Sequence, residues 1–392
     1  MPDGVLIAGG GIGGMTAALC FAQRGFDVQV FEQSAEFSEI GAGIQLSPNC
    51  TRVLHDLGLE SALREVAFLP EGTQMRDWRS GRVISCTRLG QHVLDTYGLP
   101  YYHIHRADLI QVLVHAADTT RKITLHAGAC VENVEQNNAG VSLTAGSERY
   151  EGALLVGADG IHSIVRSALF GPEAPTFTGC VAWRGLVPVD RLPVDLVRPM
   201  ATAWWGPHKH FVHYYVRGGE LVNCVCVVEK SGWEVESWNE RGDHAELKAD
   251  FAGWHDTVRV LIDNMDPAAC FKWALFDRPP IPHWGRGRVT LLGDACHPTL
   301  PFMAQGAAMA IEDAAVLARL VAQGGDVATQ LKRYETSRQA RTARIQNGSR
   351  RNARIFHMTG VPAWLRNRLV GVVQNNLLDW LYRYDALDAD SS

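Results

Sequence analysis

The start of the chain alternates between short hydrophobic runs and a helix-forming segment. The first run, 5–8, contains no polar residue, which is typical of a parallel strand buried on both faces. Residues from Met15 to Arg24 favour a helix that ends at Gly25, and 27–31 resemble a second strand. This order of strand, helix and strand predicts an α/β domain with a parallel sheet.

The middle of the chain mixes helical and strand-like patterns. A helix broken at Gly58 is predicted over 54–66, short antiparallel strands over 68–99, and a helix over 106–117. The stretch 174–275 is rich in Trp and β-branched residues with alternating polarity. That pattern predicts a second sheet, which is mostly antiparallel.

The last part returns to longer helical patterns. A buried strand is predicted over 289–292 and a long helix over 306–321. The stretch 330–374 is also predicted to be helical, with an interruption at Pro362. Its many arginines, from 333 to 354, are expected to form a solvated helix face.

Composition narrows the possible partners. The 392 residues are 46% hydrophobic and carry a net charge of −5, which gives no reason to expect nucleic acid or an anionic membrane. No apolar run reaches the length of about 18 residues that a transmembrane helix needs, and no signal-peptide pattern is visible, so we expect a cytoplasmic protein. The nine cysteines include no Cys-x-x-Cys pair, so all nine are expected to be reduced core residues, and no metal site is predicted.

The turn after the first strand reads Gly9-x-Gly11-x-x-Gly14. Gly9 permits a tight turn, Gly11 lets the backbone approach a pyrophosphate, and Gly14 lets the helix pack close to the strand. The helix N-terminus then offers N–H groups and a positive dipole end to phosphates. Glu32 stands 18 residues beyond Gly14, where a carboxylate can bind a ribose hydroxyl. These features predict a dinucleotide site and leave FAD and NAD open.

Two later motifs resemble those of a known enzyme family. The segment 157–166, Gly-Ala-Asp-Gly-Ile-His-Ser-x-x-Arg, resembles the Asp-Gly motif of single-component flavoprotein aromatic hydroxylases. The segment 293–298, Gly-Asp-Ala-Cys-His-Pro, resembles their second FAD motif and continues into 300–307. The three motifs stand in the family's order. The chain looks like the subgroup of salicylate hydroxylases, 3-hydroxybenzoate 6-hydroxylases and 6-hydroxynicotinate 3-monooxygenases.

The resemblance implies an FAD-dependent monooxygenase that hydroxylates a small phenolic aromatic acid with NAD(P)H and O2, through a flavin C4a-hydroperoxide. NAD(P)H would visit only transiently, because the chain has no second glycine fingerprint. Two other functions stay open. One is an NAD-dependent Rossmann dehydrogenase, which the first motif alone allows. The other is an FAD-dependent protein that acts as an NAD(P)H oxidase or binds flavin without hydroxylating a ring.

The predicted fold is α/β, with a Rossmann-like FAD-binding domain, an interleaved and mostly antiparallel β-sheet substrate domain, and a C-terminal helical region. The segments are, in order, 1–75 (FAD-binding), 76–99 (substrate), 100–173 (FAD-binding), 174–275 (substrate), 276–329 (FAD-binding) and 330–392 (helical). Whether 361–380 pack on the sheet or form a homodimer contact stays open.

The resemblance carries the family's FAD-binding positions onto this chain. They are Gly9, Gly11, Ile12, Gly13, Gly14, Glu32, Gln33, Arg106, Cys130, Asp159, Asp294, Gly306 and Ala307. Asp294 ends a predicted strand at the sheet edge where ligands bind in α/β folds, so its carboxylate can accept from a ribityl hydroxyl. Gly306 and Ala307 open a helix whose dipole stabilises negative charge on the reduced flavin.

Two of these positions have a structural alternative. Arg106 stands at the start of a predicted helix and could form a surface ion pair instead. Asp159 could pair with Arg166 to fix a turn. The resemblance implies instead that Asp159 and Arg166 of this chain contribute both to the packing of the FAD-binding domain and to the docking of NAD(P)H.

The segment 204–215 carries the candidate catalytic residues. On a strand, His210, Val212 and Tyr214 share one face. The resemblance implies that His210 accepts or relays the phenol proton and that Tyr214 donates a hydrogen bond to a substrate oxygen. A structural His and a core Tyr are the alternatives.

Five positions are expected to line the substrate: Gln45, Val212, Pro301, Phe302 and Met303. The last three would form an apolar wall that excludes water. Gln45 stands where hydroxynicotinate enzymes carry a His, and Pro301 stands where 3-hydroxybenzoate 6-hydroxylases carry a Gln. These departures leave a salicylate-like hydroxybenzoate by elimination. The position hydroxylated and the choice of NADH or NADPH stay open.

Overall fold

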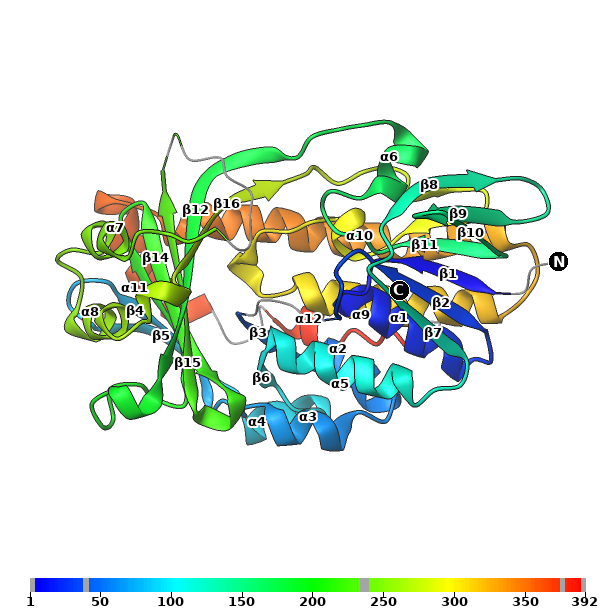
Figure 1. Ribbon diagram of the computed structural model, residues 1–392. Coiled ribbons are helices and arrows are strands. Elements are labelled where there is room, and N and C mark those ends of the chain that lie inside the picture. The colour runs from blue at the N-terminus through cyan, green and yellow to red at the C-terminus, as the bar shows by residue number, and fades with distance from the viewer. Residues whose placement is uncertain (1–3, 38–41, 231, 233–239, 374–377, 389–392) are drawn as a thin grey trace.

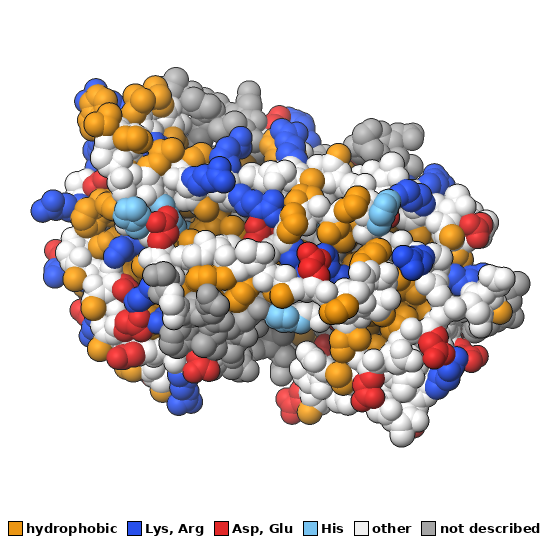
Figure 2. Space-filling model, turned by 90° about the horizontal axis from the view of Figure 1, so that it is seen from above, with side chains coloured by type: hydrophobic (Ala, Val, Ile, Leu, Met, Phe, Trp, Pro, Cys, Tyr) orange, Lys and Arg blue, Asp and Glu red, His pale blue; other side chains and the backbone are white. Residues whose placement is uncertain are grey.

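The computed structural model describes residues 4–37, 42–230, 232, 240–373 and 378–388. Its two largest sheets lie at opposite ends of an elongated molecule, and one long helix runs between them (Figure 1). Basic, acidic and hydrophobic side chains all reach the surface of both halves in the view from above (Figure 2). Within the described ranges, no helix combines the length and apolarity needed to cross a membrane.

The N-terminal strand belongs to a six-stranded sheet of order β17-β18-β11-β1-β2-β7. All pairs are parallel except β17 with β18. The strands are β1 (Val5–Ala8), β2 (Val28–Glu32), β7 (Ile123–Ala127), β11 (Leu154–Gly157), β17 (Gly285–Arg286) and β18 (Val289–Leu291). Helices and a small sheet pack against it around one hydrophobic core. They are α1 (Ile12–Gln23), α5 (Arg106–Asp118), α9 (Gly306–Ala322), β8 (Val131–Gln136), β9 (Val141–Ala145) and β10 (Glu148–Gly152).

The second large sheet has seven strands in the order β16-β12-β15-β14-β13-β4-β5. It is antiparallel apart from the pair β13 with β4. The strands are β4 (Gly72–Asp77), β5 (Val83–Arg88), β12 (Thr176–Pro188), β13 (Met200–Gly206), β14 (Lys209–Val216), β15 (Leu221–Glu229) and β16 (Phe271–Asp277). Helices α7 (His244–Asp250) and α8 (Asp256–Asp263) cover its outer face. The inner face carries His210 and Tyr214.

Shorter elements connect the two halves. They are β3 (Gly43–Leu46), α2 (Pro48–Asp56), α3 (Glu60–Val66), α4 (Gln91–Tyr97), β6 (Tyr102–His105), α6 (Ile164–Phe170), the 3-10 turns η1 (Val189–Arg191), η2 (Arg217–Gly219), η3 (Pro267–Ala269), η4 (Gly293–Ala295) and η5 (Pro301–Met303), and the helices α10 (Val327–Phe356), α11 (Gly360–Val373) and α12 (Asp379–Tyr382). The break predicted at Gly58 is confirmed, because α2 ends before it and α3 begins after it.

Two sequence predictions need correction. The stretch 68–99 was expected to contain only strands, but 91–97 form the helix α4, which ends at Gly98 in the left-handed conformation of a typical C-cap. Pro362 was expected to interrupt the C-terminal helix. It lies instead in the first turn of α11, where its missing N–H leaves no hydrogen bond unmade, and the break falls at 357–359.

The Arg-rich helix α10 is not a simple solvated face, so that expectation was wrong. Arg338 is fully buried, and its guanidinium contacts the carboxylates of Glu312 and Asp313 at 2.7 Å each. Arg341 also pairs with Glu312 at 2.7 Å. The partners lie on α9, some 25 to 29 residues earlier, so the charge pattern of α10 alone could not reveal them.

Replacing Arg338 by Ala should lower the free energy of unfolding by about 3 to 5 kcal/mol, because the buried Asp313 loses its guanidinium partner and the buried Glu312 keeps only Arg341. Chemical denaturation of the purified protein measures the change. The control is Arg351→Ala, at an exposed position on the same helix, which should shift stability by no more than about 0.5 kcal/mol. Equal effects of the two substitutions would show that the buried cluster does not stabilise the fold.

Candidate active site

The glycine loop after β1 is shaped so that larger residues do not fit. Gly9 has a φ of +102°, and a Cβ placed there would lie 2.4 Å from the carbonyl oxygen of Ala158. A Cβ on Gly14 would lie 1.9 Å from the carbonyl oxygen of Gly9. Gly11 is the N-cap of α1, and its extended backbone directs the helix N-terminus toward the loop. The cradle therefore has the form that a pyrophosphate needs.

Glu32 ends β2 beside this loop, where the sequence placed it. Its carboxylate accepts hydrogen bonds from the backbone N–H groups of Gly10 and Ser34, both at 2.8 Å. The side chain is half-buried. Two fixed N–H donors hold the carboxylate at the strand end, which is the position from which it can meet a ribose.

Asp159 follows β11 and binds the start of α6. It accepts from the Ser163 hydroxyl at 2.5 Å and from the N–H groups of Ile164 and Val165 at 2.8 and 3.1 Å. The pair that the sequence suggested between Asp159 and Arg166 is absent among the described contacts of these residues, so that alternative was wrong. Arg166 instead pairs with Glu173 at 2.7 Å.

The third motif brings together two predicted residues that are far apart in sequence. Asp294 lies in η4 after β18, and Arg106 opens α5. Arg106 acts electrostatically on Asp294 and offsets part of the rise in the pKa of Asp294 that burial causes. The Asp294 carboxylate lies within the fold, yet its side chain is accessible. Because Arg106 interacts with another predicted FAD residue, the surface ion pair is the weaker alternative.

The N-terminus of α9 faces the space between the two large sheets (Figure 1). Gly306 and Ala307 form its first turn and are partly accessible. The preceding residue, Gln305, is buried, and its amide bonds Ser47 and Asn49 at 3.0 and 3.1 Å. These bonds fix the first turn, whose N–H groups and dipole can stabilise an anion.

One row of residues crosses the inner face of the seven-stranded sheet. Ala203, Val212, Val225 and Arg184 are paired neighbours on β13, β14, β15 and β12. All four are partly accessible, although most of the residues beside them are buried. The row therefore borders open space in the middle of the sheet. Arg184 lies over the ring of Trp273 at 3.8 Å, and no sequence signal had singled it out.

Tyr214 follows Val212 two residues later on β14, so it lies on one side of this row, together with Gln45. The Tyr214 ring is 4.7 Å from the ring of His103, and its hydroxyl bonds Gln45. Tyr101 also donates to the Gln45 amide oxygen at 2.7 Å. Burial raises the pKa of Tyr214, and the positive charge of Arg184 lowers it in part, so Tyr214 stays protonated and can donate.

His210 precedes Val212 by two residues on β14, so it lies on the opposite side of the row, and it is 3% exposed. Its ring contacts those of Phe302 and Phe356, at centroid distances of 5.1 and 5.4 Å. Its Nδ1 atom lies 2.8 Å from Nε2 of His357. Burial, assisted by His357, holds the pKa of His210 well below its usual range, so the ring is neutral near pH 7.

The remaining predicted positions are spread around this space. Phe302 is buried beside His210, whereas Met303 packs into another cluster with Met309 and Pro301 is exposed. These three residues therefore do not form one continuous apolar wall as expected. Gln33 and Cys130 are exposed. Cys86 and Cys130 contradict the expectation that all nine cysteines are buried; the other seven are buried.

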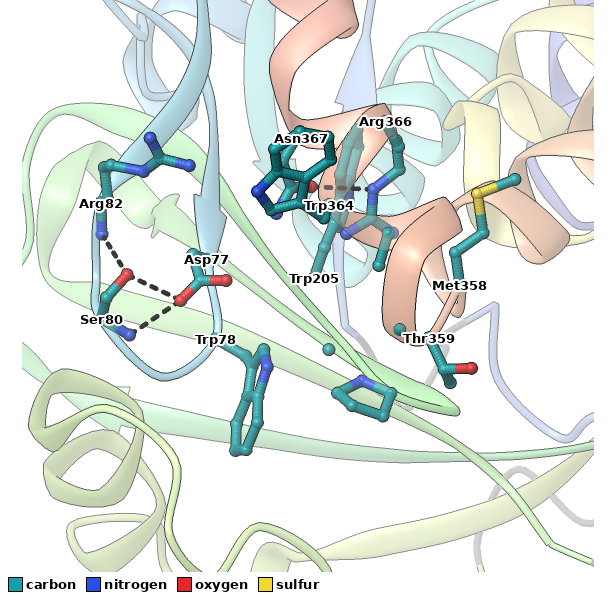
Figure 3. Close-up of a pocket in the computed structure, with 14 residues that line it drawn as sticks. Asp77, Trp78, Ser80, Arg82, Trp205, Met358, Thr359, Trp364, Arg366 and Asn367 are labelled. Carbon is teal, nitrogen blue, oxygen red and sulfur yellow. Dashed lines mark hydrogen bonds between the residues drawn. The ribbon is translucent and has the colours of Figure 1, made fainter.

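A cavity of about 310 Å³ lies behind Trp205, away from these residues (Figure 3). It is bordered by the β4–β5 and β13–β14 turns and by α11. The lining includes Asp77, Trp78, Arg82, Trp205, Trp364 and Arg366. Trp205 stacks on Phe356 at 4.7 Å, and this layer separates the cavity from His210. No residue predicted for the active site lines it.

Comparison with known proteins gives consistent matches. Residues 4–349 match the family model described as "FAD binding domain". The chain is 39% identical to 3-hydroxybenzoate 6-hydroxylase of Polaromonas naphthalenivorans, over 97% of this chain and 96% of that protein. It is 38% identical to 3-amino-4-hydroxybenzoate 2-monooxygenase of Streptomyces platensis, over 99% and 97%.

A solved structure of HpxO from Klebsiella pneumoniae, in complex with FAD and uric acid, superposes with a TM-score of 0.82 at 29% identity. The match covers 93% of this chain and 92% of that one. The glycine cradle, the held carboxylate of Glu32 and the first turn of α9 fit such a cofactor. The chain therefore belongs to the FAD-binding-domain family, and it is an FAD-dependent monooxygenase of the aromatic-acid group.

Proposed function

We propose that this enzyme hydroxylates a hydroxybenzoate-like ring that binds between the first turn of α9 and the inner face of the seven-stranded sheet. The row of partly accessible residues that crosses the sheet between His210 and Tyr214 carries the proposal, because a proton acceptor lies on one side of it and a hydrogen-bond donor on the other. Both relatives named above act on benzoates that carry a ring hydroxyl, which supports the same substrate class here.

Each residue of the proposed site has a separate role in the reaction. Bound FAD, after reduction by NAD(P)H, supplies the activation of O2. His210 is neutral and accepts the phenol proton at Nε2, which makes the substrate ring electron-rich. Tyr214 donates a hydrogen bond to a substrate oxygen, and Phe302 excludes water from the His210 end.

Arg184 is the proposed partner of the substrate carboxylate. Its guanidinium lies on the row itself, within electrostatic reach of Tyr214, and the Trp273 ring supports it from one side. Burial lowers the pKa of Arg184 to about 9, so the guanidinium is still charged near pH 7. A planar, charged group in this position suits a carboxylate, because it can donate two parallel hydrogen bonds. This assignment makes a benzoate a better substrate than the corresponding phenol.

The Arg184→Met variant should raise KM for a hydroxybenzoate by roughly 10- to 150-fold, the loss expected for a charge-assisted hydrogen bond of about 1.5 to 3 kcal/mol. It should change KM much less for the corresponding phenol without a carboxylate. Steady-state NAD(P)H oxidation with both compounds measures the two values. An equal rise for both would contradict carboxylate recognition by Arg184.

A screen of hydroxylated benzoates and nicotinates, with analysis of the product, tests the function itself. At least one compound should stimulate NAD(P)H oxidation and yield a product with one additional hydroxyl group. The His210→Ala variant should form that product about 10²- to 10⁴-fold more slowly, because it lacks the proton acceptor. Stimulated oxidation that yields only hydrogen peroxide, or an unchanged rate in His210→Ala, would contradict the proposal.

A further inference from the structure

His210 is connected to the protein surface by a chain of hydrogen bonds that crosses three elements. His210 lies on β14, His357 directly follows α10, and Glu229 ends β15. Nδ1 of His210 lies 2.8 Å from Nε2 of His357, and Nδ1 of His357 lies 2.8 Å from Oε1 of Glu229. The other carboxylate oxygen of Glu229 lies 2.7 Å from Nδ1 of His208.

The Glu229 carboxylate determines which nitrogen atoms of His357 and His210 donate hydrogen bonds and which accept them. An ionised carboxylate can only accept, so Glu229 requires a proton on Nδ1 of His357. Neutral His357 then carries its lone pair on Nε2 and can only accept from His210 there. His210 must therefore carry its proton on Nδ1, which leaves the lone pair on Nε2.

We infer that His357 and Glu229 are positioning residues that hold His210 in the tautomer with its lone pair on Nε2. The inference rests on the proposed role of His210 as proton acceptor, which requires that lone pair. When His210 takes up a proton at Nε2, its positive charge is stabilised through His357 by the carboxylate of Glu229. The arrangement follows the logic of a catalytic triad, in which a carboxylate orients an imidazole.

Burial and charge along the chain agree with this role. His210 is 3% and His357 5% exposed, whereas the Glu229 side chain is 43% exposed. Burial raises the pKa of Glu229, but hydrogen bonds from His208 and His357 together lower it by a larger amount. The net pKa is below the usual value, so Glu229 stays ionised. Burial lowers the pKa of His357. The hydrogen bond and negative charge of Glu229 raise it in part, and the positive charges of His208 and Arg366 lower it again. His357 is therefore neutral, as the donor order requires.

The backbone around His208 holds the chain in place. His208 has a φ of +60°, a left-handed conformation that is unfavourable for a residue with a side chain. In this conformation its N–H donates to the carbonyl oxygen of His357 at 3.2 Å, and its carbonyl accepts from the N–H of Glu229 at 2.9 Å. The turn thus ties both positioning residues to the strand that carries His210.

The direct test is nuclear magnetic resonance of the FAD-loaded enzyme labelled with ¹⁵N-histidine, with His210 assigned by its loss in His210→Gln. Nε2 of His210 should show the shift of a nitrogen without a proton, and Nδ1 that of a protonated nitrogen. In His357→Leu the signals should move toward the Nε2-protonated tautomer, which free histidine prefers. A wild-type His210 protonated on Nε2 would overturn the inference, whether or not His210 serves catalysis.

Activity provides the second measurement. His357→Leu should slow product formation at least about tenfold with the flavin spectrum unchanged, and His357→Gln should restore most of the rate, because its amide can accept from His210 and donate to Glu229. Glu229→Leu should behave like His357→Leu. The matched control is His283→Leu, which removes an exposed His beside Glu335 and should leave the rate unchanged. If the Leu and Gln variants lost the same fraction of the rate, His357 would act only through packing, and the inference would be contradicted.

Discussion

Two adjacent carboxylates in the middle of α9 impose the constraint on which the rest of the structure depends. Glu312 and Asp313 are both fully buried, where an uncompensated charge would be prohibitively costly. Arg338 of α10 pairs with both, and Arg341 pairs with Glu312, so two guanidinium groups balance the two carboxylates. Asp313 also accepts from His297 at 2.5 Å and from the N–H of Gly293 at 3.2 Å. The same cluster therefore fixes α9, whose first turn is proposed to face the flavin, the loop that carries Asp294 and the long C-terminal helix.

The consequence reaches the other end of the molecule. A helix of 30 residues is about 45 Å long, so α10 extends from this cluster to the seven-stranded sheet (Figure 1). Its end delivers Phe356 and His357 to His210. The proposed substrate site is thus assembled from two halves whose relative position α10 helps to define. We expect disturbance of the buried cluster to affect catalysis as well as stability.

The sequence was sufficient to predict the positions of residues whose structure depends on their neighbours in the chain. The glycine loop, Glu32 at the end of its strand, and His210 with Tyr214 on one strand face all follow from spacing, and the structure places them as expected. It was insufficient wherever the partner lies far away in the chain. Arg338 and Arg341 pair with carboxylates of α9, 25 to 29 residues earlier. Arg184 and His357 gave no local signal, since only strand pairing and the path of α10 bring them to the site.

In the proposed complex, the reacting ring lies against the inner face of the seven-stranded sheet, between His210 and Tyr214. The most direct test is a crystal structure of the enzyme with FAD and a hydroxybenzoate that it turns over. We predict that the ring lies over Val212 and Val225, with its carboxylate at Arg184 and its hydroxyl near Nε2 of His210. A ring bound elsewhere, for example in the cavity behind Trp205, would contradict the account.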